Sequence, residues 1–343
     1  MNFSFLDLFS KKELLSITRA RANEKKIGEE VSVIEKFPDD LSNNKSKFVL
    51  IGIPEDIGVR ANLGRGGAHT AWKPALENIL NLQSNGFMNG SNVLVLGHIN
   101  LDHLMNKSFH FNNKTESDIH ELRKLVEEID EIVFSVLKEI FYHGKIPIII
   151  GGGHNNSFPI IKAAAMSSTA GKINVINCDP HSDFRPKEGR HSGNGFRYAY
   201  EEDYLNKYSV FGLHESYNSA EVIEHFNALP ERLHFATFED IFIRQTTSFE
   251  NALNNCIQFC KDATCGLELD LDAITNVPSS AKTSSGLSSL QARQFIFSVA
   301  KSLKPVYFHI AEGAPVLAHI KADNKTGKLI AYLVADFIKT MDS

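Results

Sequence analysis

The chain has 343 residues, of which 43% are hydrophobic and 22% are charged, a composition typical of a globular protein. Its formal net charge of -5 argues against a broad basic surface for nucleic acid or for an anionic membrane. The N-terminus lacks the apolar core of a signal peptide, and no run of roughly 18 apolar residues occurs, so we expect a cytoplasmic protein that does not enter a membrane.

Residues 1–45 are polar and rich in charge, and we expect them to form an N-terminal extension with one helix and a loop through residues 37–40. Further along, short apolar runs, several of them ending at Gly or Pro, indicate buried strands. These runs cover residues 48–53, 93–97, 147–150, 173–177, 209–212, 267–271 and 306–310.

Helical patterns lie between several of these runs. Apolar residues recur at positions i, i+3 and i+4 over residues 122–141, and Thr115 with Asp118 resembles a capping box before them. Shorter helices are expected at residues 220–228, 249–261 and 290–303. Because short apolar strands alternate with helices, the sequence predicts an α/β fold with a parallel sheet that helices cover on both faces. The four cysteines are expected to be buried free thiols.

Two acidic strings carry most of the functional information. Residues 179–183 read Asp-Pro-His-Ser-Asp directly after one expected strand, and residues 268–272 read Glu-Leu-Asp-Leu-Asp within another. Alternate side chains of an extended chain point to the same face, so each string gathers ligating groups. Crowded carboxylates repel one another and resist desolvation, which a divalent cation would relieve. For each string alone, a polar loop or a solvated strand face is the competing interpretation.

Two further segments follow expected strands. Three glycines precede His154 and permit a tight turn, while the Lys-Ser/Thr of a phosphate-binding loop is missing there. Glu312 follows the last strand. Because the carboxyl ends of parallel strands form the ligand-binding edge of such sheets, we expect these segments to meet. Two histidines and four aspartates can hold two metal ions, and such carboxylate-rich ligation favours ions such as Mn²⁺.

In their order along the chain, these motifs resemble the ureohydrolase family, which contains arginases, agmatinases and formimidoylglutamases. The resemblance runs from about Lys47 to the C-terminus, so we expect residues 46–343 to form the catalytic domain. The segments that carry it are residues 52–56, 62–68, 151–154, 179–183, 192–194, 270–272 and 285–288, together with Glu312.

The resemblance implies a three-layer α/β/α sandwich around an eight-stranded, mainly parallel sheet, and a centre with two Mn²⁺ ions per subunit. By motif position, one ion would be held by His154, Asp179, Asp183 and Asp270, and the other by His181, Asp179, Asp270 and Asp272. Asp179 and Asp270 would bridge the two ions.

The resemblance also suggests how catalysis and binding are divided. Asp183 would orient the nucleophile and pass its proton to the leaving amine, and Glu312 would anchor a cationic substrate group. The substrate's carboxylates need cationic or amide donors. The expected substrate-binding residues are Arg190, Asn194 and Arg197, with Arg65 as a further donor and His191 and His214 close to the matched segments.

The departures from the family pattern bear on the substrate. Arginases carry a histidine where this chain has Phe196, and formimidoylglutamases resemble the chain at this position and in the segment before His154. We therefore expect hydrolysis of N-formimidoyl-L-glutamate to L-glutamate and formamide, a step of histidine degradation. The alternatives are an arginase- or agmatinase-type amidinohydrolase that releases urea, and a catalytically silent metal-binding member.

Further departures are Pro180, Thr275-Asn276 and Glu268, the last in place of a small hydroxyl residue. Glu268 could perturb the metals or add an acid behind them. By analogy with the family, we expect a homo-oligomer that acts on a small molecule and binds neither nucleic acid nor membrane.

Overall fold

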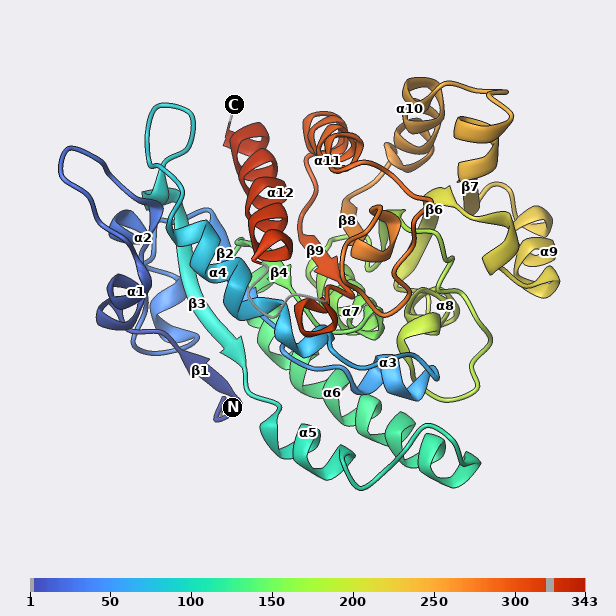
Figure 1. The fold of residues 1–343 in the computed structure, drawn as a ribbon, viewed down its shortest axis with the longest axis horizontal. Helices are drawn as coiled ribbons and strands as arrows, with labels where there is room; N and C mark the ends of the chain where they lie inside the picture. Colours follow the sequence, from blue (N-terminus) through green and yellow to red (C-terminus); the bar gives the residue numbers. More distant parts are fainter. Residues whose placement is uncertain (1–2, 319–323, 343) are drawn as a thin grey trace.

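The computed structural model describes residues 3–318 and 324–342, in which nine strands form one sheet (Figure 1). The strand order is β1-β3-β2-β4-β9-β8-β5-β6-β7, with β1 antiparallel to β3 and the other pairs parallel. The strands are β1 Leu6–Leu8, β2 Phe48–Gly52, β3 Val93–Ile99, β4 Ile146–Ile150, β5 Ile173–Cys178, β6 Leu205–Leu213, β7 Leu233–Thr237, β8 Cys265–Asp270 and β9 Phe308–Ala311.

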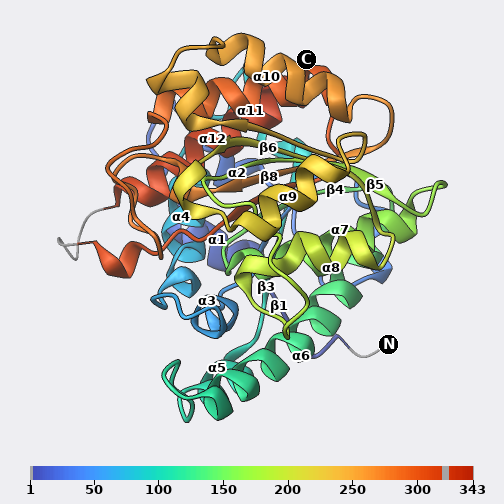
Figure 2. The same cartoon turned by 90° about the vertical axis from the view of Figure 1, so that its right-hand side faces the viewer.

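Helices cover both faces of the sheet, as Figures 1 and 2 show. Phe48 and Leu50 of β2 face the core below α4, α10, α11 and α12, whereas Val49 and Ile51 face the core formed with α5 to α9. The helices are α1 Lys11–Ile17, α2 Ile27–Glu30, α3 Ile57–Ala61, α4 Trp72–Leu80, α5 Asp102–Ser108, α6 Glu116–Tyr142, α7 Ser157–Ser167, α8 Gly195–Glu201, α9 Ala220–Ala228, α10 Phe249–Cys260, α11 Ser289–Leu303 and α12 Lys325–Asp342. The three-layer prediction is confirmed.

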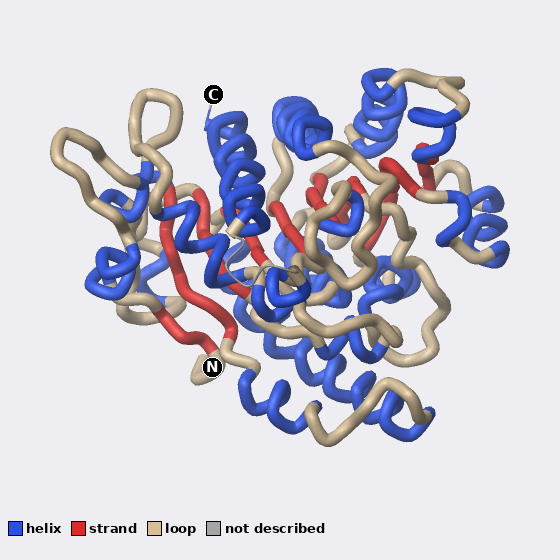
Figure 3. The backbone as a smooth tube through the Cα atoms, viewed as in Figure 1, coloured by secondary structure: helices blue, strands red, loops and turns tan. Residues whose placement is uncertain are grey.

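The strand count exceeds the expected eight because the N-terminal segment contributes β1. Leu6, Asp7 and Leu8 pair with Ile99, His98 and Gly97 of β3, so that β1 forms the edge of the sheet. Gly97 permits this approach, since its φ is 137° and a Cβ there would lie 1.8 Å from the carbonyl oxygen of Asp7. Residues 3–45 thus contain β1, α1 and α2 rather than the single expected helix (Figure 3).

The expected strands and helices occur with shifts of a few residues at their ends. Thr115 caps α6 by accepting a hydrogen bond from the Asp118 N–H at 3.2 Å. All four cysteines are buried and free, as predicted. Within the described residues, none of the helices combines the length and the apolarity that crossing a membrane requires.

Candidate metal centre

The predicted ligands come from strands that are neighbours in the sheet. His154 follows β4, Asp179 follows β5, Asp270 ends β8 and Glu312 follows β9. These four strands occupy the consecutive positions β4-β9-β8-β5 at the centre of the sheet. The carboxyl ends of parallel strands lie on one edge, so residues more than a hundred positions apart in sequence meet there.

The glycine loop before His154 is fixed by a buried acid. Gly151 and Gly152 have φ angles of 91° and 78°. The Glu55 carboxylate accepts hydrogen bonds from the N–H of Gly153 at 2.9 Å and from the Asn156 side chain at 2.7 Å. Burial raises the pKa of Glu55. Glu55 belongs to the matched segment 52–56, but this role was not predicted from the sequence.

Strand alternation brings Glu268 and Asp270 of β8 to the same side, where both approach His154, whereas the other acidic residues of the two strings lie in turns beyond the strands. β5 ends at Cys178 and β8 ends at Asp270, while Asp272 lies on the 3-10 helix Leu271–Ala273. Asp183 has a φ of 45° and Glu312 one of 64°, a left-handed conformation that is uncommon for residues other than glycine. Such strained residues are concentrated at functional sites.

His154 lies among three carboxylates. Its Nδ1 is 3.0 Å from an Asp183 oxygen, 3.1 Å from an Asp179 oxygen and 3.3 Å from an Asp270 oxygen. The ring is fully buried, and neither of its nitrogens makes a hydrogen bond of good geometry within the described part of the chain. A buried nitrogen that faces three carboxylate oxygens without such a bond fits a metal ligand.

A second group adjoins the first. His181, Asp270 and Asp272 each offer a ligand atom within 4.8 Å of the others. The Oδ1 of Asp179 lies 3.4 Å from His181 Nδ1, whereas its Oδ2 faces His154. Asp270 belongs to both groups and Asp179 reaches both, as the bridging positions require. The structure brings all six predicted residues together, and their role as ligands stays a prediction.

The close packing of these charged groups shifts their pKa values. Burial, followed by repulsion from neighbouring carboxylates, raises the pKa of Asp183 and of Asp270. Burial opposes a charge on His181, but the hydrogen bond and charge of Asp179 outweigh it and raise the pKa of His181 to about 10. Excess buried negative charge and oxygen-rich donors suit a hard or borderline divalent cation.

A cavity of about 660 Å³ opens onto both groups. Glu312 lines it, accepts a hydrogen bond from the His154 N–H at 2.9 Å and accepts another from the Ser280 hydroxyl at 2.7 Å. Burial and then the charge of Asp272 raise the pKa of Glu312 to about 8. Ser280 was not found from the sequence, because no motif or periodicity marks it.

A profile of the arginase family matches residues 46–339. The chain belongs to the arginase family. A curated formimidoylglutamase of Streptococcus pyogenes (serotype M5, strain Manfredo) is 27% identical over 302 residues, covering 86% of this chain and 84% of that protein. The formimidoylglutamase of Macrococcus caseolyticus is 27% identical over 217 residues, covering 62% of this chain and 66% of that protein. The predictions of this family and of a hydrolase are confirmed.

Two solved structures share the fold. The formiminoglutamase of Trypanosoma cruzi with Mn²⁺ has a TM-score of 0.72 at 21% identity and covers 94% of this chain and 99% of its own. The formimidoylglutamase of Bacillus subtilis has a TM-score of 0.73 at 17% identity and covers 95% of this chain and 94% of its own. At these identities the likeness establishes the arginase-like fold alone.

In this arginase-family chain, Arg190, which was expected to bind substrate, forms an ion pair within the protein. It is buried and pairs with Asp130 of α6 at 2.7 and 3.2 Å. It also donates to the Asn194 side chain at 2.8 Å and to the carbonyl oxygen of Asn155 at 2.7 Å. Arg190 therefore fastens the loop next to His154, and its donors are engaged.

The other expected substrate contacts also lie outside the described cavity lining. Asn194 is buried and donates to the backbone oxygens of Pro186 and Gly189. Arg197 contacts the Glu201 carboxylate through Nε, and its guanidinium lies over the Phe184 ring at 5.2 Å. Both side chains are engaged within the protein and neither is part of the described lining, and their role as substrate contacts stays a prediction. The arginine in the described lining is Arg185, which was not predicted from the sequence to bind substrate.

The remaining residues flagged from the sequence also lie near the site. Arg65 is exposed and reaches the carbonyl oxygen of Ser280 at 3.5 Å. His191 is buried and accepts a hydrogen bond from the Gly193 N–H at 3.1 Å. His214 is buried and stacks on Tyr217.

Phe196 forms a wall of the centre. Its ring is fully buried, meets the His154 ring edge-on at 5.1 Å and stacks on Tyr208 at 4.4 Å. The position that is a histidine in arginases is therefore part of the apolar support of His154 in this chain.

Proposed function

We propose that this arginase-family hydrolase holds two Mn²⁺ ions and cleaves N-formimidoyl-L-glutamate with water to L-glutamate and formamide. The observation that carries the proposal is the convergence of two histidines and four aspartates at the ends of neighbouring strands, beside one cavity. The curated relatives described above are formimidoylglutamases, and the Trypanosoma cruzi formiminoglutamase structure contains Mn²⁺.

The ions would be held by the residues of the two overlapping groups, namely His154, Asp179, Asp183 and Asp270 for one and His181, Asp179, Asp270 and Asp272 for the other. When bound, they supply an activated water as the nucleophile. The chain's own residues then position the substrate, hold the proton and confine the reaction to the cavity.

Two residues would act on the substrate directly. The Glu312 carboxylate, held by Ser280 and the His154 N–H, is placed to pair with the cationic formimidoyl group. Water adds to the formimidoyl carbon, the bond from that carbon to the glutamate nitrogen breaks, and formamide separates. Asp183 takes a proton from the water and delivers it to the leaving nitrogen.

The cavity also offers donors for the substrate's carboxylates. Arg185 and Asn62 line it, and the Arg185 guanidinium is close to the Glu188 carboxylate, at 3.0 Å. We assign the carboxylate contacts to Arg185, because guanidinium groups bind carboxylates in two-point geometry.

The test is a substrate comparison with protein that has been stripped by a chelator and reloaded with Mn²⁺. Formimidoylglutamate, arginine and agmatine are assayed side by side, with formamide and urea as the diagnostic products. We expect formamide from formimidoylglutamate and no turnover in the stripped protein. Urea from arginine or agmatine would assign an amidinohydrolase instead, and absence of turnover with all three substrates would refute the proposal.

A further inference from the structure

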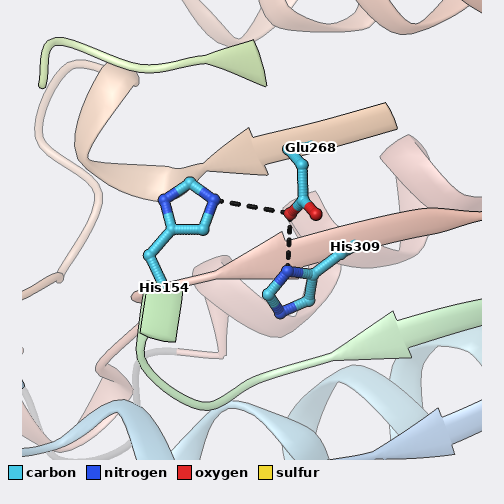
Figure 4. A group of neighbouring side chains, drawn as sticks. All are labelled: His154, Glu268 and His309. Atoms are coloured by element: carbon cyan, nitrogen blue, oxygen red, sulfur yellow. Dashed lines mark hydrogen bonds and ion pairs between the residues drawn. The ribbon is translucent and has the colours of Figure 1, made fainter. Parts of the chain in front are cut away.

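A buried glutamate stands directly behind the candidate centre. Glu268 lies on β8, two residues before Asp270, and is fully buried. Its Oε2 is 2.6 Å from His309 Nδ1 and 3.4 Å from His154 Nε2, and its Oε1 accepts a hydrogen bond from the Tyr307 hydroxyl at 2.8 Å. Figure 4 shows Glu268 between the two imidazole rings.

The partners of Glu268 are built into the sheet. β8 and β9 are parallel neighbours, and Glu268 and His309 are directly paired across them. The second ring nitrogen of His309 lies 3.4 Å from the carbonyl oxygen of Gly151, so both nitrogens face acceptors. The Glu268 carboxylate is thus paired with His309 and hydrogen-bonded to Tyr307 inside the core. A buried carboxylate is costly unless it is paired in this way.

The position of Glu268 determines how His154 can serve as a ligand. A neutral imidazole carries one N–H, and an acceptor at one nitrogen fixes the proton there. The Glu268 carboxylate is 3.4 Å from Nε2, a charge contact that favours the proton on that nitrogen and leaves the Nδ1 lone pair on the side of the three aspartates. Carboxylates in this arrangement orient ligating histidines and raise their basicity.

We propose that Glu268 is the positioning residue of His154, and that His309 holds Glu268 in place. The inference rests on the proposed two-metal function. It assigns to the residue that departs from the family's small hydroxyl a specific task, which is to fix the ring and the proton of one ligand. Binding of an ion by the His154 group would depend on Glu268, whereas the group of His181, Asp270 and Asp272 does not include it.

The test compares Glu268→Ala and Glu268→Gln with a matched control, Tyr307→Phe. Tyr307→Phe removes a buried hydrogen bond to the other oxygen of the same carboxylate and leaves the contact with His154 intact. Stepwise Mn²⁺ affinities are measured by titration, and electron paramagnetic resonance separates an isolated Mn²⁺ from a coupled pair. Unfolding of the metal-free proteins gives the structural contribution.

We expect the affinity for one ion to fall about 10–100-fold in Glu268→Ala. A signal of isolated Mn²⁺ should then appear at concentrations where the wild type holds a pair. Glu268→Gln keeps the shape of the side chain and an acceptor oxygen, so this variant should stay folded. Its Mn²⁺ affinity should lie between those of the wild type and Glu268→Ala. Tyr307→Phe should change the Mn²⁺ affinity by less than about threefold, while the metal-free variant should unfold at a lower urea concentration than the wild type.

Three outcomes would overturn the inference, and only the last would also overturn the proposed function. If the wild type binds two ions and both Glu268 variants bind them with unchanged affinity, only the positioning role fails. If Tyr307→Phe weakens Mn²⁺ binding as much as Glu268→Ala, the effect is one of general packing and the role fails as well. A wild type that binds no Mn²⁺ would overturn the proposed function together with this inference.

Discussion

Replacing Arg190 by methionine should destabilise the protein, because the buried carboxylate of Asp130 would lose its charged partner. The substitution keeps an unbranched apolar stem, and it removes the guanidinium with both of its contacts to Asp130. Removing one partner of a buried ion pair costs about 3–5 kcal/mol. The double variant Asp130→Leu/Arg190→Met should lose less than Arg190→Met alone, because no unpaired charge then remains in the core.

The loss should depend on pH with a definite sign. Burial raises the pKa of Asp130 to about 6, although Arg190 acts in the opposite direction. The pKa in the unfolded chain is about 3.9, so the stability linked to this raised pKa is complete below about pH 4 and is lost as pH rises through 6. Removal of Arg190 raises the folded pKa further, and each unit is worth about 1.4 kcal/mol. Between pH 8 and pH 5, the free energy of unfolding of Arg190→Met should therefore rise by at least about 1 kcal/mol more than that of the wild type.

The assay is urea unfolding of chelator-treated protein at both pH values, followed by the fluorescence of Trp72. Differences between variant and wild type cancel the titration of the remaining groups. A loss below about 1 kcal/mol, or one that does not change with pH, would refute the reasoning. A raised KM with unchanged stability would instead restore Arg190 as a substrate contact.

Three further outcomes follow from the site. Asp270→Asn should abolish high-affinity Mn²⁺ binding and nearly all turnover, since Asp270 belongs to both ligand groups. The exposed control Asp203→Asn should change neither. Metal analysis and the formamide assay check both variants. Glu312→Gln keeps an acceptor for Ser280 but loses the charge, so KM for the cationic substrate should rise at least about tenfold with Mn²⁺ still bound, and an unchanged KM would contradict the anchor. Phe196→His should release no urea from arginine, because the side chain supports His154 and does not line the cavity; strong arginine hydrolysis would show otherwise.

The site residues that lie at the ends of strands were predictable from the sequence. His154, Asp179 and Asp270 each adjoin a strongly apolar run, and the parallel arrangement brings them together without any further information. The amphipathic helix 122–141 and its cap at Thr115 were predictable for the same reason, because local periodicity and capping chemistry determine them. α12 was missed although Ile330, Leu333, Val334 and Phe337 follow a helical spacing that could have been read.

Other features were not accessible from local patterns. Arg190 finds its partner on α6, sixty residues earlier, where Asp130 interrupts the buried face of the helix. Glu268 finds His309 across the sheet, and either residue alone gives no indication of the other. β7 was missed because its middle residues are only half-buried, so its pattern lacks a continuous apolar run. These contacts are set by tertiary packing, which local periodicity does not encode.

The short strand β1 has a practical consequence for anyone who wishes to produce this protein. A chain that began at residue 46 would retain the portion matched by the family and would look complete by that measure. It would also lack β1, so β3 (Val93–Ile99) would become the edge of the sheet. The backbone N–H and C=O groups of β3 that now pair with Leu6–Leu8 could then pair with strands of other molecules. Such a shortened product should aggregate, so recombinant work ought to keep the first residues.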